Sequence, residues 1–163
     1  MRVWPRGTAA VDCLSTSRVG LTPGHRPGVS RLREVTGTHK AYGLYVHITW
    51  HTWRRQPSVH RADVLHVVDA MREAAQRCGV HIQEQAVLTD HVHIVASLRP
   101  DVTLASFVRH AKSESARRLN LNGNGGFRWA RGYFAESLSR NHIATACVYV
   151  AKQHRRHPDL VPT

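Results

Sequence analysis

The chain has 163 residues, which is enough for one compact domain with a buried core and too few for two domains of ordinary size. Its 23 Lys and Arg against 11 Asp and Glu give a formal net charge of +12, and its 13 histidines can add partial positive charge because an unperturbed imidazole has a pKa of about 6.5. The basic residues are dispersed along the chain instead of lining one amphipathic helix, which favours nucleic acid over a membrane surface as the polyanionic partner.

The cysteines and the N-terminal residues indicate the compartment. Cys13, Cys78 and Cys147 are far apart and lack a Cys-x-x-Cys spacing, which argues against a disulfide framework or a zinc knuckle. Asp12 and the hydroxyl residues after Leu14 interrupt the short apolar stretch that a signal peptide would need. No stretch reaches the length of about 20 apolar residues that spans a membrane. We therefore expect a protein of the reducing cytoplasm.

Residues 1–40 lack any hydrophobic period and carry three prolines and five glycines. Such a segment buries too little apolar surface to offset its chain entropy. The sequence therefore predicts an N-terminal extension over 1–40, either flexible or translated from an over-long gene assignment. A folded domain is expected over 41–156 and a short tail over 157–163.

The folded part shows seven stretches with the period of a regular element. In chain order they are a strand over 44–51, a helix over 61–78, strands over 80–87 and 91–98, a helix over 104–119, a strand over 127–138 and a helix over 141–154. Gly79 stands where a helix end commonly needs a left-handed residue. The βαββαβ order predicts an α+β fold of the ferredoxin-like or RRM-like kind, an antiparallel sheet with two helices on one face and an extra C-terminal helix.

The most informative stretch is His91-Val92-His93 in the third predicted strand. Because side chains at i and i+2 of a strand point the same way, His91 and His93 converge on one face while Val92 and Ile94 face the other. Two imidazoles about 7 Å apart along a strand can share one divalent cation at ligand distances of about 2 Å. A His-x-His pair is also common without a metal in a histidine-rich chain. A histidine-triad nucleotide hydrolase is disfavoured because its third alternate histidine is Val95 here.

The last predicted helix carries Tyr149 and Gln153, which stand four residues apart and therefore share one helical face with Thr145. A helical tyrosine more often only covers a sheet with its ring. Together with His91 and His93, however, these residues supply what metal-assisted phosphodiester cleavage needs, namely ligands for a cation and a hydroxyl nucleophile. A free phenol has a pKa of about 10, so removal of its proton would be part of the catalysis.

These motifs, taken in order, resemble those of the single-tyrosine HUH transposases, which comprise small insertion-sequence transposases and their repeat-associated relatives. The resemblance covers about residues 41–154. Its pieces are VHITW at 46–50, DHVHIV at 90–95, the helical segment 107–119, WARGYF at 129–134 and YVAKQ at 149–153.

The resemblance implies an RRM-like catalytic domain that binds single-stranded or hairpin DNA and uses Mg²⁺ or Mn²⁺. It also implies a homodimer, located in the cytoplasm in association with the bacterial nucleoid. It implies that His91, His93 and Gln153 hold the metal. Tyr149 would attack a phosphodiester to form a 5′-phosphotyrosine link, serving its own or the partner's metal site. Tyr133 is a rival nucleophile, but it falls on a strand within the family's structural Gly-Tyr-Phe motif.

Basic and aromatic residues outside this centre are candidate nucleic-acid contacts, because they pair with phosphates and stack on bases. They are Arg54, Arg55, Arg109, Lys112, Arg117, Trp129 and Arg131. Trp53 is a further candidate for stacking, and it replaces a lysine that family members often carry. A non-catalytic single-stranded nucleic-acid-binding regulator on the same fold is the alternative function. A nicking initiator or relaxase is a third, disfavoured by the short chain.

Overall fold

The computed structural model describes residues 43–123 and 125–163, so the predicted extension over 1–40 lies outside the described residues. The strands and longer helices are β1 (Leu44–His51), α1 (Val64–Cys78), β2 (Val80–Val87), β3 (His91–Leu98), α2 (Leu104–Leu121), β4 (Phe134–Leu138), α3 (Ile143–Ala151) and α4 (Gln153–Arg156). Their order confirms the predicted βαββαβ arrangement followed by a C-terminal helix. In the described residues no helix combines the length and the apolar character needed to cross a membrane.

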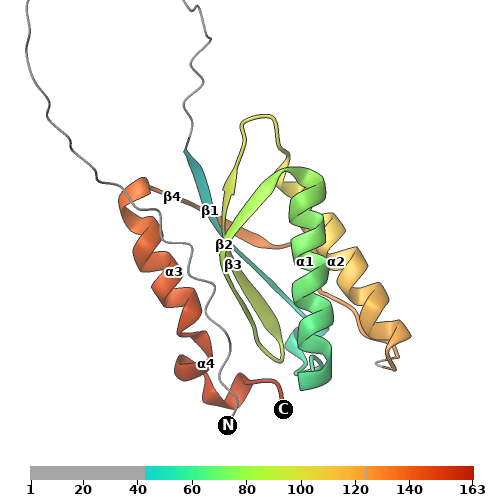
Figure 1. The fold of residues 1–163 in the computed structure, drawn as a ribbon. Coiled ribbons are helices and arrows are strands. Elements are labelled where there is room, and N and C mark those ends of the chain that lie inside the picture. Colours follow the sequence, from blue (N-terminus) through green and yellow to red (C-terminus); the bar gives the residue numbers. More distant parts are fainter. Residues whose placement is uncertain (1–42, 124) are drawn as a thin grey trace, which may run out of the picture. The chain divides into compact units, whose positions relative to one another are not determined.

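The four strands form one antiparallel sheet with the order β2-β3-β1-β4, so β1 and β3 are the central strands. Helices α1 and α2 lie together on one side of this sheet, and α3 lies on the other side (Figure 1). The pairing of β1 with β3 sets His51 opposite His91 and His47 opposite Val95. The sheet and its helices confirm the predicted α+β, RRM-like fold.

The alternation of side chains along β3 separates a core face from a site face. Val92 and Ile94 are completely buried in the core that α1 and α2 cover. His91 and His93 are offset by one position and therefore lie on the opposite face, toward α3, as the sequence predicts. Val95 follows them on that face and packs in a second, smaller hydrophobic cluster. The sheet thus presents the two histidines to the C-terminal helices.

The C-terminus of α1 follows the sequence prediction. Gly79 has a φ of 68°, in the left-handed region, and its N–H donates to the carbonyls of Ala75 and Gln76. This conformation is costly for any residue with a Cβ, so glycine allows the chain to turn directly from α1 into β2.

Two predicted elements are shorter than expected. The predicted strand over 127–138 is continuous only over Phe134–Leu138, which pairs with β1. In its first half Trp129 forms a single antiparallel bridge with Thr52, and the Ala130 N–H donates to the His51 carbonyl at 2.8 Å. The predicted helix over 141–154 is interrupted at Lys152, which separates α3 from α4. The last residues also pack on the domain, since the Leu160 carbonyl accepts a hydrogen bond from the Thr89 N–H.

Phe107 on α2 gives a test of the core. It is completely buried, so Phe107→Ala is expected to lower the free energy of unfolding by about 3–5 kcal/mol. Leu121, on the same helix, is 74% exposed, so Leu121→Ala is expected to change it by less than about 0.5 kcal/mol. Urea denaturation followed by circular dichroism measures both. Equal effects of the two substitutions would contradict the burial of Phe107 in the core.

Candidate metal centre and nucleophile

The two histidines of β3 converge at one point on the site face. His91 and His93 are 9% and 8% exposed, and their Nε2 atoms are 3.1 Å apart. Two nitrogens at this separation can both lie about 2.1 Å from one cation, with an angle of about 90° between the two bonds. The strand therefore brings the two predicted ligands together in a geometry that suits a six-coordinate divalent cation.

The outer nitrogens of these two rings have hydrogen-bond partners. The Nδ1 atom of His91 lies 2.5 Å from the carboxylate of Asp90, and the Nδ1 atom of His93 lies 2.9 Å from Nε2 of His47. Protons on both Nδ1 atoms satisfy these contacts and leave both Nε2 lone pairs facing each other. Two lone pairs at that separation repel, and a cation between them removes the repulsion, so the network suits metal ligation.

Gln153 carries a buried oxygen that lacks a protein partner. Its side chain is completely buried, and its Nε2 donates to the Tyr149 carbonyl at 3.2 Å. Its Oε1 accepts no hydrogen bond from any residue that the structure describes. A buried acceptor without a partner costs about 1–3 kcal/mol, and an amide oxygen is a ligand for Mg²⁺ or Mn²⁺. The donor set of two imidazoles and one amide oxygen therefore fits such a cation.

The break between α3 and α4 turns Gln153 inward. The sequence predicts Tyr149 and Gln153 on one face of a continuous helix, but α3 ends before Lys152, where ψ is 6°. His154, the next residue, hydrogen-bonds the Val87 carbonyl at 2.8 Å and so fixes α4 to the end of β2. The ring of His157, after α4, has its centroid 6.5 Å from that of His91. Helix α4 thus lies at the end of the sheet that carries His91.

Tyr149 lies beside the histidines of its own chain. Its ring centroid is 5.9 Å from that of His93 and 6.0 Å from that of His47, and both contacts are edge-on. The ring is half-buried, and the Arg156 guanidinium lies 4.8 Å from its centroid. The candidate nucleophile, the candidate ligand pair and a cationic side chain that can attract a phosphate are therefore neighbours.

His93 and His47 are held in the neutral form, because the pKa of each ring is lowered. Burial, together with the neighbouring imidazoles of His91 and His47, lowers the pKa of His93 to about 3. Burial also lowers the pKa of His47, against the opposing charge of Glu136. Neutral imidazole is the form that donates a lone pair to a metal, so the ring of His93 is ready for ligation at neutral pH.

A second grouping shares one histidine with this centre. Ligand atoms of His51, Asp90 and His91 all lie within 4.8 Å of one another. The contact of 2.5 Å between Asp90 and His91 is a hydrogen-bond length, shorter than the separation of about 3 Å between adjacent ligands of one cation. Asp90 is therefore the hydrogen-bond partner that orients His91, and the Nε2 side of the ring is the candidate metal side.

Trp129, a predicted nucleic-acid contact, lies in the hydrophobic core and offers little ring surface to a base. The side chain is 8% exposed, and its Nε1 donates to the Ser115 hydroxyl at 2.9 Å. Its ring meets those of Trp50 and Phe127 edge-on. The sequence alone does not distinguish an aromatic ring that stacks on a base from one that packs in the core, and the Trp129 ring packs in the core against α2.

Lys112 makes a structural contact that no local sequence pattern indicates. Its Nζ donates to the carbonyls of Ala130 and Gly132 at 2.6 and 2.7 Å, which pins the segment before β4 to α2. Arg117 is paired with Glu114 at 2.7 Å. The remaining candidate contacts are exposed, namely Arg54, Arg55, Arg109 and Arg131.

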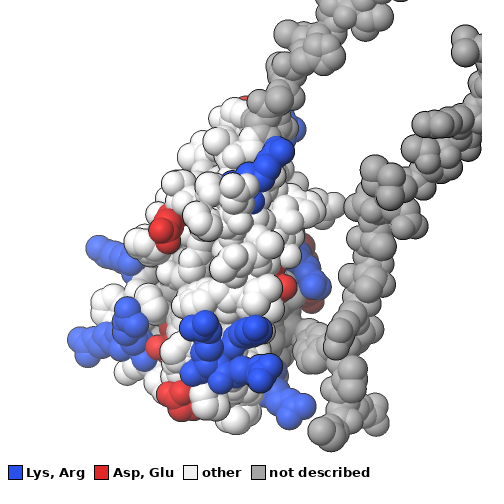
Figure 2. All heavy atoms as spheres, turned by 90° about the vertical axis from the view of Figure 1, so that its left-hand side faces the viewer, with Lys and Arg blue, Asp and Glu red and all other residues white. Residues whose placement is uncertain are grey.

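The side of the molecule where α3 and α4 lie carries positive charge. Figure 2 shows Lys and Arg side chains gathered at its lower end, with few acidic side chains among them. Lys152, Arg155 and Arg156 are exposed basic residues at and beside α4. A phosphate backbone that approaches this side would meet positive charge next to Tyr149.

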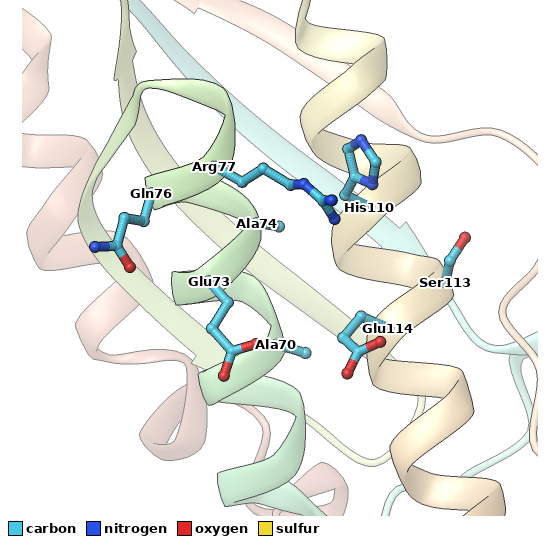
Figure 3. A pocket seen from close by; sticks show the side chains of 8 residues that line it. All are labelled: Ala70, Glu73, Ala74, Gln76, Arg77, His110, Ser113 and Glu114. Atoms are coloured by element: carbon cyan, nitrogen blue, oxygen red, sulfur yellow. The ribbon is translucent and has the colours of Figure 1, made fainter.

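A hollow of about 520 Å³ lies on the other side of the sheet, between α1 and α2 (Figure 3). Its lining includes Glu73, Arg77, His110 and Glu114, with charges of both signs. Arg118 bridges Glu73 and Glu114 beside it. It is remote from the histidine pair, which lies on the opposite face, and we assign the candidate site to the histidines.

Comparison with known proteins extends these observations. The profile of the family described as IS200-like transposases matches residues 40–153. The ISDra2 transposase TnpA of Deinococcus radiodurans is 32% identical over 127 residues, which cover 72% of this chain and 89% of that protein. A crystallised protein of the same organism, assigned as a transposase, aligns at 25% identity over 73% of this chain and 97% of its own, with a TM-score of 0.57. A REP-associated tyrosine transposase bound to a REP hairpin shares the fold, with a TM-score of 0.60 at 16% identity over 75% of this chain and 74% of its own.

Proposed function

The chain belongs to the IS200-like transposase family and is therefore a DNA endonuclease and strand transferase; we propose that it cleaves single-stranded DNA beside a hairpin through a metal-dependent attack by Tyr149. The observation that carries this proposal is the cluster of Tyr149, His93 and His91 on one face of the sheet. The buried, unpartnered Oε1 of Gln153 supports the metal.

The residues of this cluster divide the chemistry among them. His91, His93 and Gln153 would hold Mg²⁺ or Mn²⁺, and the bound cation would polarise the scissile phosphate. The Tyr149 oxygen forms a bond to phosphorus while the bond from phosphorus to the 3′ oxygen breaks. The phenol loses one proton and the departing 3′ oxygen gains one, which leaves a 5′-phosphotyrosine link and a free 3′ hydroxyl. The number of phosphoester bonds is unchanged, so the reverse attack can rejoin DNA.

Basic and aromatic residues around this cluster support the binding of single-stranded and hairpin DNA. The basic residues of α4 lie next to Tyr149, and Trp53 at the exit of β1 is partly exposed. The Arg128 guanidinium lies 4.2 Å from the centroid of the Trp53 ring. Arg54 and Arg55, which follow Trp53 in the chain, both have a φ of 55°, in the left-handed region. Aromatic rings and arginines of this kind bind unpaired bases and phosphates. A hairpin with a single-stranded flank offers both.

The proposed assembly is a homodimer that acts on chromosomal DNA in the cytoplasm, beside the nucleoid. Val148 on α3 and Phe134 on β4 are 51% and 58% exposed. Apolar side chains at this exposure are available for contact with a second subunit. The distance between the rings of Tyr149 and His93 is compatible with cleavage by one chain's own tyrosine.

A gel assay tests the function against the alternative of a non-catalytic regulator, which the net charge of +12 equally suits. The protein is incubated with single-stranded oligonucleotides that carry the hairpin ends of its own element, with Mn²⁺ or with chelator. We expect a covalent protein–DNA band on a denaturing gel with Mn²⁺ and none with chelator. Hairpin binding without any covalent band in Mn²⁺ would favour the regulator, and a band that persists in chelator would contradict the role of the metal.

A further inference from the structure

His47 on β1 makes a contact that the proposed reaction does not use. Its Nε2 lies 2.9 Å from Nδ1 of His93, the ring nitrogen that points away from His91. The two rings are stacked, with centroids 5.2 Å apart and an angle of 11° between their planes. His47 and His93 are 46 residues apart in the sequence, and the pairing of β1 with β3 brings them together.

The tautomer of His93 decides whether it can bind a cation. A neutral imidazole carries one N–H, and only the other nitrogen has a lone pair in the ring plane for a metal. If His93 donates Nδ1–H to His47, its Nε2 lone pair is directed at Nε2 of His91, where the cation is proposed. If the proton were on Nε2, the same ring would present a hydrogen to the cation.

We propose that His47 is a positioning residue, which accepts the Nδ1–H of His93 and so holds that ring in the tautomer and orientation that bind the divalent cation. The inference rests on the proposed function, because the cation is the cofactor proposed there. Asp90 holds the same relation to His91, at 2.5 Å. The two proposed ligands thus have different hydrogen-bond partners, a carboxylate for His91 and an imidazole for His93. Outer partners of this kind typically change metal affinity about 10- to 100-fold.

An acceptor at Nε2 of His47 fixes the tautomer of that ring as well. For that atom to accept, the proton of the His47 ring must be on Nδ1. Glu136 stands directly opposite His47 in the β1–β4 pairing, on the same face of the sheet. The Tyr149 ring covers His47 edge-on with centroids 6.0 Å apart, which limits rotation of the imidazole.

His51 provides a matched control in the same strand. It is four residues after His47 and therefore on the same face, and its ring centroid is 5.3 Å from that of His91. Its Nδ1 is buried without a hydrogen-bond partner among the described residues. It is thus a histidine of similar position, next to the other ligand, without the contact that the proposal assigns to His47.

A Mn²⁺ titration of the DNA-free protein, followed by electron paramagnetic resonance, tests the proposal. His47→Leu is expected to raise the Kd for Mn²⁺ at least about tenfold. His47→Gln places an amide oxygen where Nε2 lies, so it is expected to stay within about threefold of wild type. His51→Leu is also expected to bind like wild type. Circular dichroism and the Tm establish that each variant is folded.

Several outcomes overturn the role of His47. Wild-type affinity in folded His47→Leu would do so, as would an equal loss in His47→Gln. A loss in His51→Leu as large as that in His47→Leu would move the cation to the Asp90 side of His91 and would also overturn it. A wild-type protein that binds Mn²⁺ as expected but forms no covalent complex on its own hairpin ends contradicts the proposed function, while the titration series still supports the positioning role.

Discussion

Replacing Tyr149 with phenylalanine is expected to abolish the covalent protein–DNA complex, lowering its rate of formation by more than about a thousandfold. The phenylalanine ring keeps the edge-on contacts with His93 and His47, whose centroids lie 5.9 and 6.0 Å away. Only the oxygen that would attack phosphorus is lost. The measurement is the time course of the covalent band with labelled hairpin DNA and Mn²⁺, and binding of the same DNA is measured by mobility shift.

Tyr133→Phe is the matched control for this experiment. Tyr133 is 42% exposed and stands just before β4, so its hydroxyl is available to solvent and to DNA. We expect this variant to form the covalent complex at close to the wild-type rate, and Tyr149→Phe to bind hairpin DNA at close to the wild-type affinity. A covalent band from Tyr149→Phe, lost instead in Tyr133→Phe, would identify the other tyrosine as the nucleophile.

The sequence was sufficient to predict the sheet and the histidine pair because both depend on local periods. Alternation along β3 puts His91 and His93 on one face whatever the neighbouring strands do. The contact of His93 with His47 depends on the register between strands 46 residues apart, and no local pattern encodes that register. His47 is part of the motif at 46–50, but the motif alone does not show what its ring contacts.

The errors came from residues whose local preference is overridden by packing. Aromatic residues are common in strands, so Phe127 and Trp129 extended the prediction of β4. In the structure Lys112 holds the carbonyls of residues 130 and 132, and Gly132, with a φ of 79°, lies between the buried aromatics and the strand. The interruption after α3 has no local signal either, because neither Gly nor Pro is present there. It coincides with burial of Gln153 and with the contact of His154 with β2.

Gln153→Leu is expected to preserve the stability of the metal-free protein and to reduce both stabilisation by Mn²⁺ and metal-dependent activity. Leucine fills the buried position without the unpartnered Oε1, so the free energy of unfolding in chelator is expected to stay within about 1 kcal/mol of wild type or to rise. The variant loses a proposed ligand, so the rise in Tm that Mn²⁺ gives the wild-type protein is expected to shrink. Formation of the covalent complex is expected to fall about a hundredfold.

Gln153→Glu separates the loss of a ligand from the loss of an amide. Its carboxylate keeps an oxygen for the cation, so Mn²⁺ is expected to raise its Tm at least as much as that of wild type. In chelator the same variant carries a buried carboxylate without a cation, and its Tm is expected to fall below that of Gln153→Leu. If Mn²⁺ stabilised Gln153→Leu as strongly as wild type, the buried oxygen would have no part in metal binding. The cation would then rest on His91 and His93 alone among the proposed ligands.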